Sequence, residues 1–194
     1  MKRILTVLLA GIMLLVLVSC GSGNGGRIVI TLRSDIAPVT CENFESLVNE
    51  GFYNGLTFHR IIDGFMAQGG DPNGDGTGGR SRTIQGEFKD NGFENTLYHK
   101  RGVVSMARSI GYNSASSQFF ICYTDCGILN GQYAAFGEVT EGMDVVDRFL
   151  EVKRSLGSDG ELSSPKSPVR MKSVKMMEPD ESGNHRVEII MDKF

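Results

Sequence analysis

Apolar and polar residues alternate, or apolar residues form short runs, along most of the chain after residue 26. Residues 27–32 (RIVITL) alternate and are rich in β-branched side chains, a pattern typical of a β-strand. Apolar segments of similar length follow, separated by polar turns: 56–62, 65–68, 103–106, 118–123, 134–139, 169–177 and 186–191. The pattern therefore predicts a mainly β fold.

Two segments instead have apolar residues at helical spacing, which predicts helices over residues 38–50 and 143–150. Pro38 suits the first turn of the earlier helix, and Gly51 is a favourable stop after it. Residues 157–168 are polar and predict a loop. Many short strands and two helices favour a closed antiparallel β-barrel whose openings are covered by helices.

Composition agrees with one globular domain. The chain has 194 residues, of which 40% are hydrophobic and 22% charged, close to the values of ordinary folded domains. Its 25 glycines show no three-residue period, so they belong to turns rather than to a collagen helix. The formal net charge of −3 argues against a nucleic-acid-binding surface.

The first 19 residues have the character of an export signal. Two basic residues precede an apolar run over residues 4–18, which is too short for a stable transmembrane helix. The run ends in LVSC, which resembles the lipobox of bacterial lipoproteins, where the cysteine is lipidated and becomes the new N-terminus. We therefore expect residues 1–19 to be a signal peptide, Cys20 to carry lipid and residues 20–26 to be a flexible linker. The protein would then lie on the extracytoplasmic side of a bacterial cell membrane; a plain signal peptide or an uncleaved anchor is the alternative.

The three remaining cysteines, Cys41, Cys122 and Cys126, are odd in number and cannot all pair with one another. Their spacing matches neither a CxxC redox motif nor a zinc knuckle, so we expect free, mostly buried thiols. A Cys122–Cys126 disulfide is the alternative, and it needs the intervening turn to bring the two Cβ atoms together.

Motifs of metal and cofactor sites are incomplete. Asp71, Asn73 and Asp75 imitate the start of a calcium-binding loop. Arg82 stands where that loop requires a bidentate glutamate. The same segment has the GxGxxG spacing but lacks the strand–turn–helix context of a dinucleotide site. The three histidines are scattered without the spacing of metal ligands, so the sequence predicts no metal and no cofactor.

Four blocks of residues occur together in an order typical of one enzyme family. They are FHRIIDGFMAQGG at 58–70, VSMA at 104–107, SQFFI at 117–121 and LNGQYAAFG at 129–137. With their neighbours they resemble the cyclophilin family of peptidyl-prolyl cis-trans isomerases over residues 27–177. The resemblance implies a closed eight-stranded antiparallel β-barrel capped by two α-helices, with the substrate groove on its outer face.

The resemblance also implies roles for particular side chains. Arg60 would be the catalytic arginine. The groove would be lined by Phe65, Met66, Phe120 and Leu129 around the proline ring, Gln68 and Gln118 along the substrate backbone, Ala107 and Arg108 at the strand edge that pairs with the peptide, and Tyr133 where many eukaryotic members have a histidine.

The chemistry of X–Pro isomerisation agrees with these residues. Rotation interrupts amide resonance, with a barrier of ~18–20 kcal/mol, but it breaks no bond and needs neither a nucleophile nor a metal. It needs an apolar pocket for the ring and a donor for the amide nitrogen, whose lone pair returns in the twisted state. The permanently charged, forked guanidinium of Arg60 suits that task, whereas His59 beside it is predicted to be structural.

The sequence therefore predicts a membrane-tethered isomerase that acts, as a monomer, on proline-containing polypeptides and unfolded exported proteins. The alternative is a binding module or holdase that grips proline-containing peptides without turnover. Such a module would have no use for a guanidinium aimed at the amide nitrogen. A third reading, an inactivated barrel with a structural role, predicts decayed groove residues, and those here are intact.

The chain departs from the family pattern at two places. Ile128 stands where cyclosporin-sensitive members carry a tryptophan, so we expect weak cyclosporin binding. The family usually has a further strand before the one at 27–32, and here a glycine-rich stretch stands in its place. We hypothesise that residues 186–191, in the C-terminal extension 178–194, fill the vacancy beside 27–32 and also pair with 169–177. A frayed tail is the alternative.

Overall fold

The computed structural model describes residues 25–194. Eight strands form one sheet: β1 (Gly26–Leu32), β2 (Thr57–Ile62), β3 (Met66–Asp71), β4 (Val103–Met106), β5 (Phe119–Cys122), β6 (Ala135–Glu141), β9 (Met171–Met177) and β10 (Arg186–Met191). Their order is β2-β3-β5-β4-β6-β1-β10-β9, and every neighbouring pair is antiparallel. The predicted strands are thus all present, with ends shifted by a few residues at most, and the mainly β fold is confirmed.

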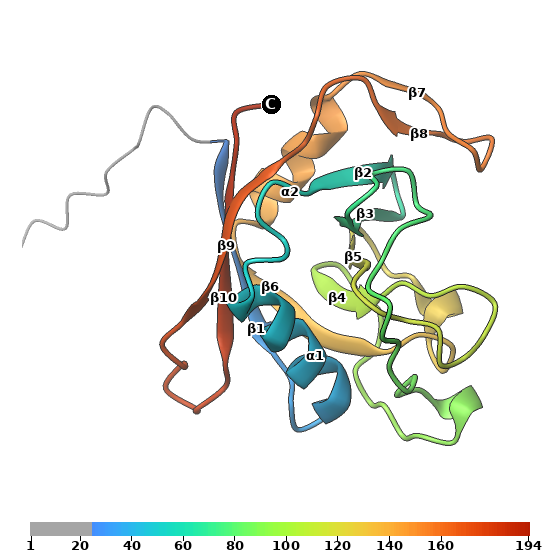
Figure 1. Ribbon diagram of the computed structural model, residues 1–194, viewed down its shortest axis with the longest axis vertical. Coiled ribbons are helices and arrows are strands. Elements are labelled where there is room, and N and C mark those ends of the chain that lie inside the picture. The colour runs from blue at the N-terminus through green and yellow to red at the C-terminus, as the bar shows by residue number, and fades with distance from the viewer. Residues whose placement is uncertain (1–24) are drawn as a thin grey trace, which may run out of the picture.

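The sheet curls strongly but is an open half-barrel, so the expectation of a closed barrel was wrong. β2 and β9 are the two ends of the strand order (Figure 1). Within residues 25–194 a single bridge, between Thr57 and Arg170, joins the two edges, with hydrogen bonds beside it such as Phe58 N–H to Val169 O at 2.9 Å. The chain reaches β9 from a separate hairpin that lies against β2, so only Val169 and Arg170, just before β9, run beside β2 and no continuous ladder forms.

That hairpin consists of β7 (Arg154–Leu156) and β8 (Leu162–Pro165), which pair only with each other. Residues 157–168 were predicted to be a loop without strands, and β8 shows that this was wrong in part. The pairing is too short, and its residues too polar, to produce an alternating pattern. The predicted helices are present as α1 (Pro38–Asn49) and as α2 (Met143–Arg148), which continues into η3 (Phe149–Glu151). Two further 3₁₀ turns are η1 (Lys89–Asn91) and η2 (Gly127–Leu129).

The core lies inside the curl of the sheet, between its concave face and α1. Phe44 of α1 is fully buried and packs against Tyr53, Phe119 and Phe136, with ring centroids 5.0–5.4 Å apart. Edge-on and tilted contacts of this kind add to the burial of the rings. Helix α1 is thereby fixed over one opening of the half-barrel. It does not cover the convex face of β2, β3, β5 and β4.

The N-terminus of α1 is capped by a residue from a distant loop. Ala37, at the N-cap position, offers no side-chain acceptor. The buried carboxylate of Glu87 accepts the N–H groups of Val39 and Thr40 at 3.0 and 2.8 Å and the Thr40 hydroxyl at 2.6 Å. Glu87 thus satisfies backbone donors that have no partner within the helix.

Strand β10 occupies the position that the sequence hypothesis gave it. It pairs with β1, where Ile189 stands opposite Ile28, and with β9, where Ile189 stands opposite Val174. Val187, Ile189 and Met191 are all fully buried. The pairing of residues 186–191 with both predicted partners is therefore confirmed, and the tail is not frayed.

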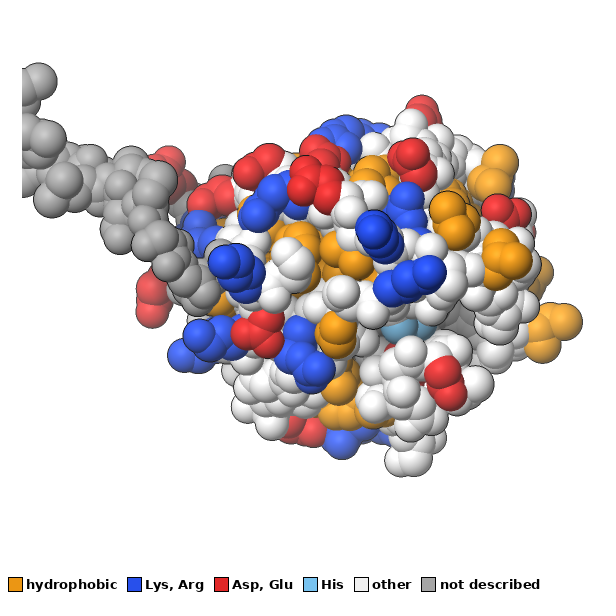
Figure 2. Space-filling model, turned by 90° about the horizontal axis from the view of Figure 1, so that it is seen from above, with side chains coloured by type: hydrophobic (Ala, Val, Ile, Leu, Met, Phe, Trp, Pro, Cys, Tyr) orange, Lys and Arg blue, Asp and Glu red, His pale blue; other side chains and the backbone are white. Residues whose placement is uncertain are grey.

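Several expectations concern residues that the structure does not describe. The signal peptide at 1–19, the lipid on Cys20 and most of the linker at 20–26 lie outside residues 25–194. Within the described residues, no helix has the length and the apolar character needed to cross a membrane. The three described cysteines are free and buried, as expected. On the face shown in Figure 2, basic side chains are interspersed with acidic ones rather than gathered into one stripe.

Candidate active site

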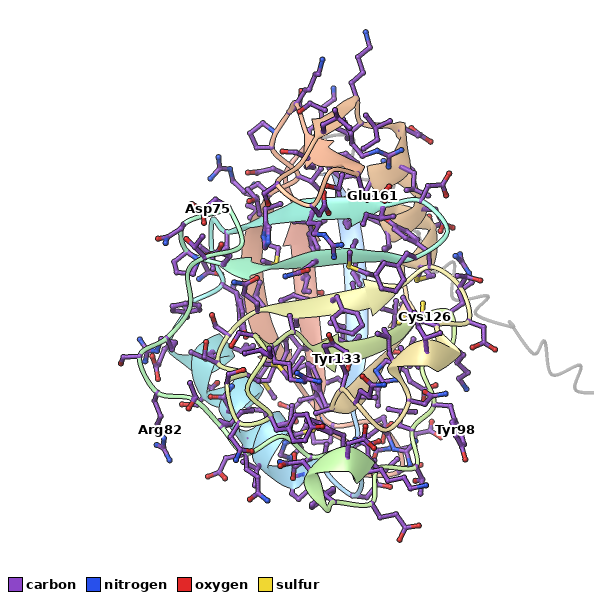
Figure 3. All side chains as sticks on the ribbon, turned by 90° about the vertical axis from the view of Figure 1, so that its right-hand side faces the viewer. Asp75, Arg82, Tyr98, Cys126, Tyr133 and Glu161 are labelled. Atoms are coloured by element: carbon purple, nitrogen blue, oxygen red, sulfur yellow. The ribbon has the colours of Figure 1, made fainter. Side chains whose placement is uncertain are left out.

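A pocket of about 280 Å³ opens on the convex face of the sheet, and Tyr133, one of its lining residues, is labelled in Figure 3. It is lined by Arg60, Phe65, Met66, Gln68, Ala107, Arg108, Phe120, Leu129 and Tyr133. These are the residues that the sequence placed in the groove, except Gln118, which lines an adjoining cavity of about 630 Å³ together with Gln68 and Arg108. The structure thus brings together side chains from positions that span more than 70 residues of the chain.

Strand register explains how three of these side chains come to form one row. Arg60 on β2 stands opposite Gln68 on β3, and Gln68 stands opposite Phe120 on β5. Residues directly opposite each other across antiparallel strands project to the same face of the sheet. The row therefore runs across three strands, with the guanidinium at one end and the aromatic ring at the other.

The floor of the pocket is apolar. Met66, Phe120 and Leu129 form a small cluster of buried residues on the convex face, separate from the main core. Tyr133 packs edge-on against Phe120, with ring centroids 5.9 Å apart. A compact, water-poor surface of this kind suits a small aliphatic ring, which gains about 25 cal/mol for each Å² of apolar area removed from water.

A neutral histidine supports this floor from behind. The ring of His99 stacks on Phe120, with centroids 6.1 Å apart. Both of its nitrogens are engaged, Nδ1 with Asn130 Oδ1 and Nε2 with Ser105 Oγ, each at 2.9 Å. Burial lowers the pKa of His99, so the ring stays uncharged at neutral pH and holds Phe120 without adding charge to the pocket.

A chain of side-chain amides runs along one wall. Arg60 Nη1 donates to Gln68 Oε1 at 3.4 Å, and Gln68 Nε2 donates to Gln118 Oε1 at 2.8 Å. Gln118 Nε2 in turn donates to the carbonyl oxygens of Gly76 and Gly78 at 3.0 and 2.7 Å. The two amides are therefore fixed in orientation by the glycine-rich loop, and they can present donors and acceptors to a peptide backbone.

Arg108 lies where the pocket meets the adjoining cavity, and like Gln68 and Ala107 it lines both. Its guanidinium lies over the rings of Tyr133, Phe88 and Tyr112, with 4.7, 5.2 and 5.2 Å from Cζ to the ring centroids. Its Nε donates to Gln132 O at 3.0 Å. These contacts hold the charge of Arg108 against aromatic faces, where cations bind favourably.

His59 precedes Arg60 in β2, but it is badly placed for proton transfer. Its two ring nitrogens are buried, and neither has a hydrogen-bond partner among residues 25–194. Burial is the main cause that lowers the pKa of His59, so the ring is neutral at physiological pH. Within the described residues, no group of three potential metal ligands is found either.

One charged contact of the site was missed from the sequence. Arg60 Nε donates to Asp159 Oδ2 at 2.6 Å, and Asp159 lies in the turn between β7 and β8. The Asp-Gly pair at 159–160 is a turn signal that could have located the hairpin. No local pattern could have shown that this turn reaches a residue 99 positions earlier in the chain.

Comparison with known proteins gives the same family as the four sequence blocks. The family model described as "Cyclophilin type peptidyl-prolyl cis-trans isomerase/CLD" matches residues 16–176. A peptidyl-prolyl cis-trans isomerase of Helicobacter pylori is 46% identical over 130 residues, which are 66% of this chain and 77% of the relative. Peptidyl-prolyl cis-trans isomerase B of Bacillus subtilis is 46% identical over 121 residues, 62% of this chain and 81% of the relative. A peptidyl-prolyl cis-trans isomerase of Acinetobacter baylyi is 41% identical over 158 residues, 79% and 81% of the two chains.

A solved structure has the same fold. It is a cyclophilin type peptidyl-prolyl cis-trans isomerase of Cryptosporidium parvum, crystallised in the presence of the dipeptide Ala-Pro, and it matches with a TM-score of 0.68 and 32% identity. The match covers 77% of this chain and 92% of that one. The chain therefore belongs to the cyclophilin-type peptidyl-prolyl cis-trans isomerases. Its function is the cis-trans isomerisation of peptidyl-prolyl bonds, as the four sequence blocks indicated.

Proposed function

We propose that this protein isomerises X–Pro bonds in exported polypeptides at the outer surface of a bacterial membrane, with Arg60 as its catalytic residue. The observation that carries the proposal is the position of the Arg60 guanidinium at the edge of a pocket of about 280 Å³ with an apolar floor, in one row with Gln68 and Phe120.

The pocket and the arginine divide the chemical work between them. A proline ring seated on Met66 and Phe120 would hold one side of the peptide bond in place while the other side rotates. As the bond twists, the prolyl nitrogen loses conjugation and becomes a hydrogen-bond acceptor. A fixed guanidinium stabilises that acceptor more in the twisted state than in the planar one, and each ~1.4 kcal/mol gained lowers the barrier enough for a tenfold faster rate.

The solved relative supports the ligand class. Its structure was determined in the presence of Ala-Pro, a dipeptide whose one peptide bond is an X–Pro bond. This chain has a pocket with an apolar floor on the same fold. Proline-containing segments of unfolded polypeptides are therefore the proposed substrates. The amides of Gln68 and Gln118 would bind the peptide backbone, and the strand edge at Ala107 and Arg108 would lie alongside it.

The membrane location is supported by the sequence before the described fold. The LVSC sequence that ends at Cys20 resembles a lipobox, and only a short glycine-rich stretch separates Cys20 from β1. Such a stretch, even fully extended, spans only about 20 Å. A lipid on Cys20 would therefore keep the folded domain close to the membrane, where newly exported chains emerge.

Fractionation of cells that express the full chain tests the anchor. We expect the wild-type protein in the membrane fraction, with mass spectrometry showing a diacylglyceryl group on an N-terminal Cys20. The Cys20→Ser variant should lose both properties, whereas Ser22→Ala, a matched change two residues away, should keep them. Wild-type protein without lipid in the soluble fraction would contradict the membrane-surface role while leaving the isomerase function intact.

A further inference from the structure

The turn of the β7–β8 hairpin places a carboxylate directly against the catalytic arginine. Asp159 Oδ2 accepts the Nε–H of Arg60 at 2.6 Å. Figure 3 labels Glu161, in the same turn, close to β2, the strand that carries Arg60. The side chains of Arg60 and Asp159 are 32% and 23% exposed, so the pair lies at the rim of the groove rather than in the core.

Asp159 is itself held in one orientation. Its second oxygen, Oδ1, accepts the hydroxyl of Ser163 at 2.9 Å and the backbone N–H of Glu161 at 3.0 Å. Ser163, on β8, is 2% exposed. One oxygen is thus committed to the turn and the other to Arg60. The adjacent arginine is the main cause that lowers the pKa of Asp159, so the carboxylate is charged wherever the enzyme works.

Arg60 is held at two of its three guanidinium nitrogens. Asp159 takes Nε, and Gln68 takes Nη1 at 3.4 Å. Among residues 25–194, Nη2 makes no hydrogen bond. A guanidinium is planar and rigid, so contacts at two of its nitrogens define where the third points. The unoccupied donors therefore have a fixed direction before substrate arrives.

We propose that Asp159 is a positioning residue for Arg60: its carboxylate orients the guanidinium so that the free donors face the prolyl nitrogen. The inference rests on the proposed catalytic role of Arg60. A partly exposed ion pair contributes little to folding stability, so its main consequence lies in geometry rather than in holding the hairpin to the sheet. Pre-orientation of this kind raises the rate because the group need not be ordered during the reaction.

Turnover by the full-length protein tests the proposal. Asp159→Ala should lower kcat about tenfold, with KM changed less than twofold, because the proline pocket is untouched. Asp159→Asn, which keeps the shape and loses the charge, should give an intermediate loss. The matched control is Asp180→Ala in the β9–β10 turn, where Asp180 accepts the N–H groups of Ser182 and Asn184 but contacts no groove residue. It should retain activity within twofold of wild type.

Two further measurements separate positioning from a structural effect. In an Arg60→Ala background, Asp159→Ala should cause no further loss, since there is no guanidinium left to orient. In ¹⁵N NMR spectra, the Nε–H resonance of Arg60 should exchange slowly with water in the wild type and rapidly in Asp159→Ala.

Three results would overturn the proposal. The first is wild-type kcat in Asp159→Ala. The second is an equal loss of activity from Asp159→Ala in the presence and in the absence of Arg60. The third is failure of the underlying role, in which Arg60→Ala keeps full turnover. The third outcome can be told apart from the others: in the protein that keeps Arg60, Asp159→Ala would still change the exchange of the Arg60 Nε–H resonance but would not change turnover.

Discussion

The burial of β10 leads to a quantitative prediction about the C-terminal extension. Ile189 is fully buried between Ile28 on β1 and Val174 on β9, and backbone ladders on both sides prevent the site from collapsing. Truncating a buried isoleucine to alanine costs 2–5 kcal/mol, depending on how far the cavity can close, and we expect about 3 kcal/mol for Ile189→Ala. For a domain of this size, that loss lowers Tm by about 6–12 °C.

The neighbouring residue provides a matched control. Ile190 alternates to the other face of β10 and is half-buried, so Ile190→Ala should cost less than about 1 kcal/mol. Urea and thermal unfolding of both variants measure the difference, and isomerase activity at 25 °C should remain because the groove is on other strands. Equal unfolding midpoints for Ile189→Ala, Ile190→Ala and the wild type would show that the extension does not contribute to the folded sheet.

Three other predictions follow from buried polar groups. Glu87→Ala should lower the free energy of unfolding in urea by about 3 kcal/mol, because the N–H and hydroxyl of Thr40 lose their buried acceptor. Glu94→Ala, at an exposed position, should change stability by less than about 0.5 kcal/mol, and similar values for both variants would contradict the capping role. Burial lowers the folded-state pKa of His99 below its ordinary value of 6.5, so the unfolded chain takes up the proton first as the pH falls. Stability should therefore be constant above about pH 7 and should fall as pH drops through 6.5 toward the folded pKa. Unfolding midpoints that do not fall between pH 7.5 and 5.5 would contradict this. The kcat/KM of isomerisation should be nearly flat from pH 6 to 8, because no proton is transferred and burial keeps His59 neutral; a bell-shaped profile would show that an acid or base takes part.

Much of the fold could be predicted because period-two patterns record which face of a strand is buried. Burial alternates along 186–191, and the structure pairs this strand with 27–32 in the predicted way, although Ile28, Val29 and Ile30 in the latter strand are all fully buried. Closure of the barrel could not be predicted, since it depends on whether β2 and β9 run side by side for several residues. That is decided by the path of the β7–β8 hairpin, a polar segment without a periodic signal.

The apolar floor of the candidate site could also be anticipated. Phe120 and Leu129 belong to sequence blocks whose order is specific to one family, and both line the pocket. Contacts made by loops over long sequence separations could not be predicted from the sequence. Asp159 reaches Arg60 across 99 positions, and Glu87 caps a helix that begins 49 residues before it. Each of these depends on the tertiary path of a loop rather than on a local pattern.

The catalytic role of Arg60 is the central claim, and a protease-coupled isomerisation assay on residues 21–194 tests it most directly. Wild-type protein should accelerate X–Pro isomerisation strongly, and Arg60→Ala should lose at least about 100-fold in kcat/KM while still binding a proline-containing peptide. Equal turnover by the two proteins would contradict the role of the guanidinium. A folded wild type that binds the peptide without turning it over would instead identify a binding module.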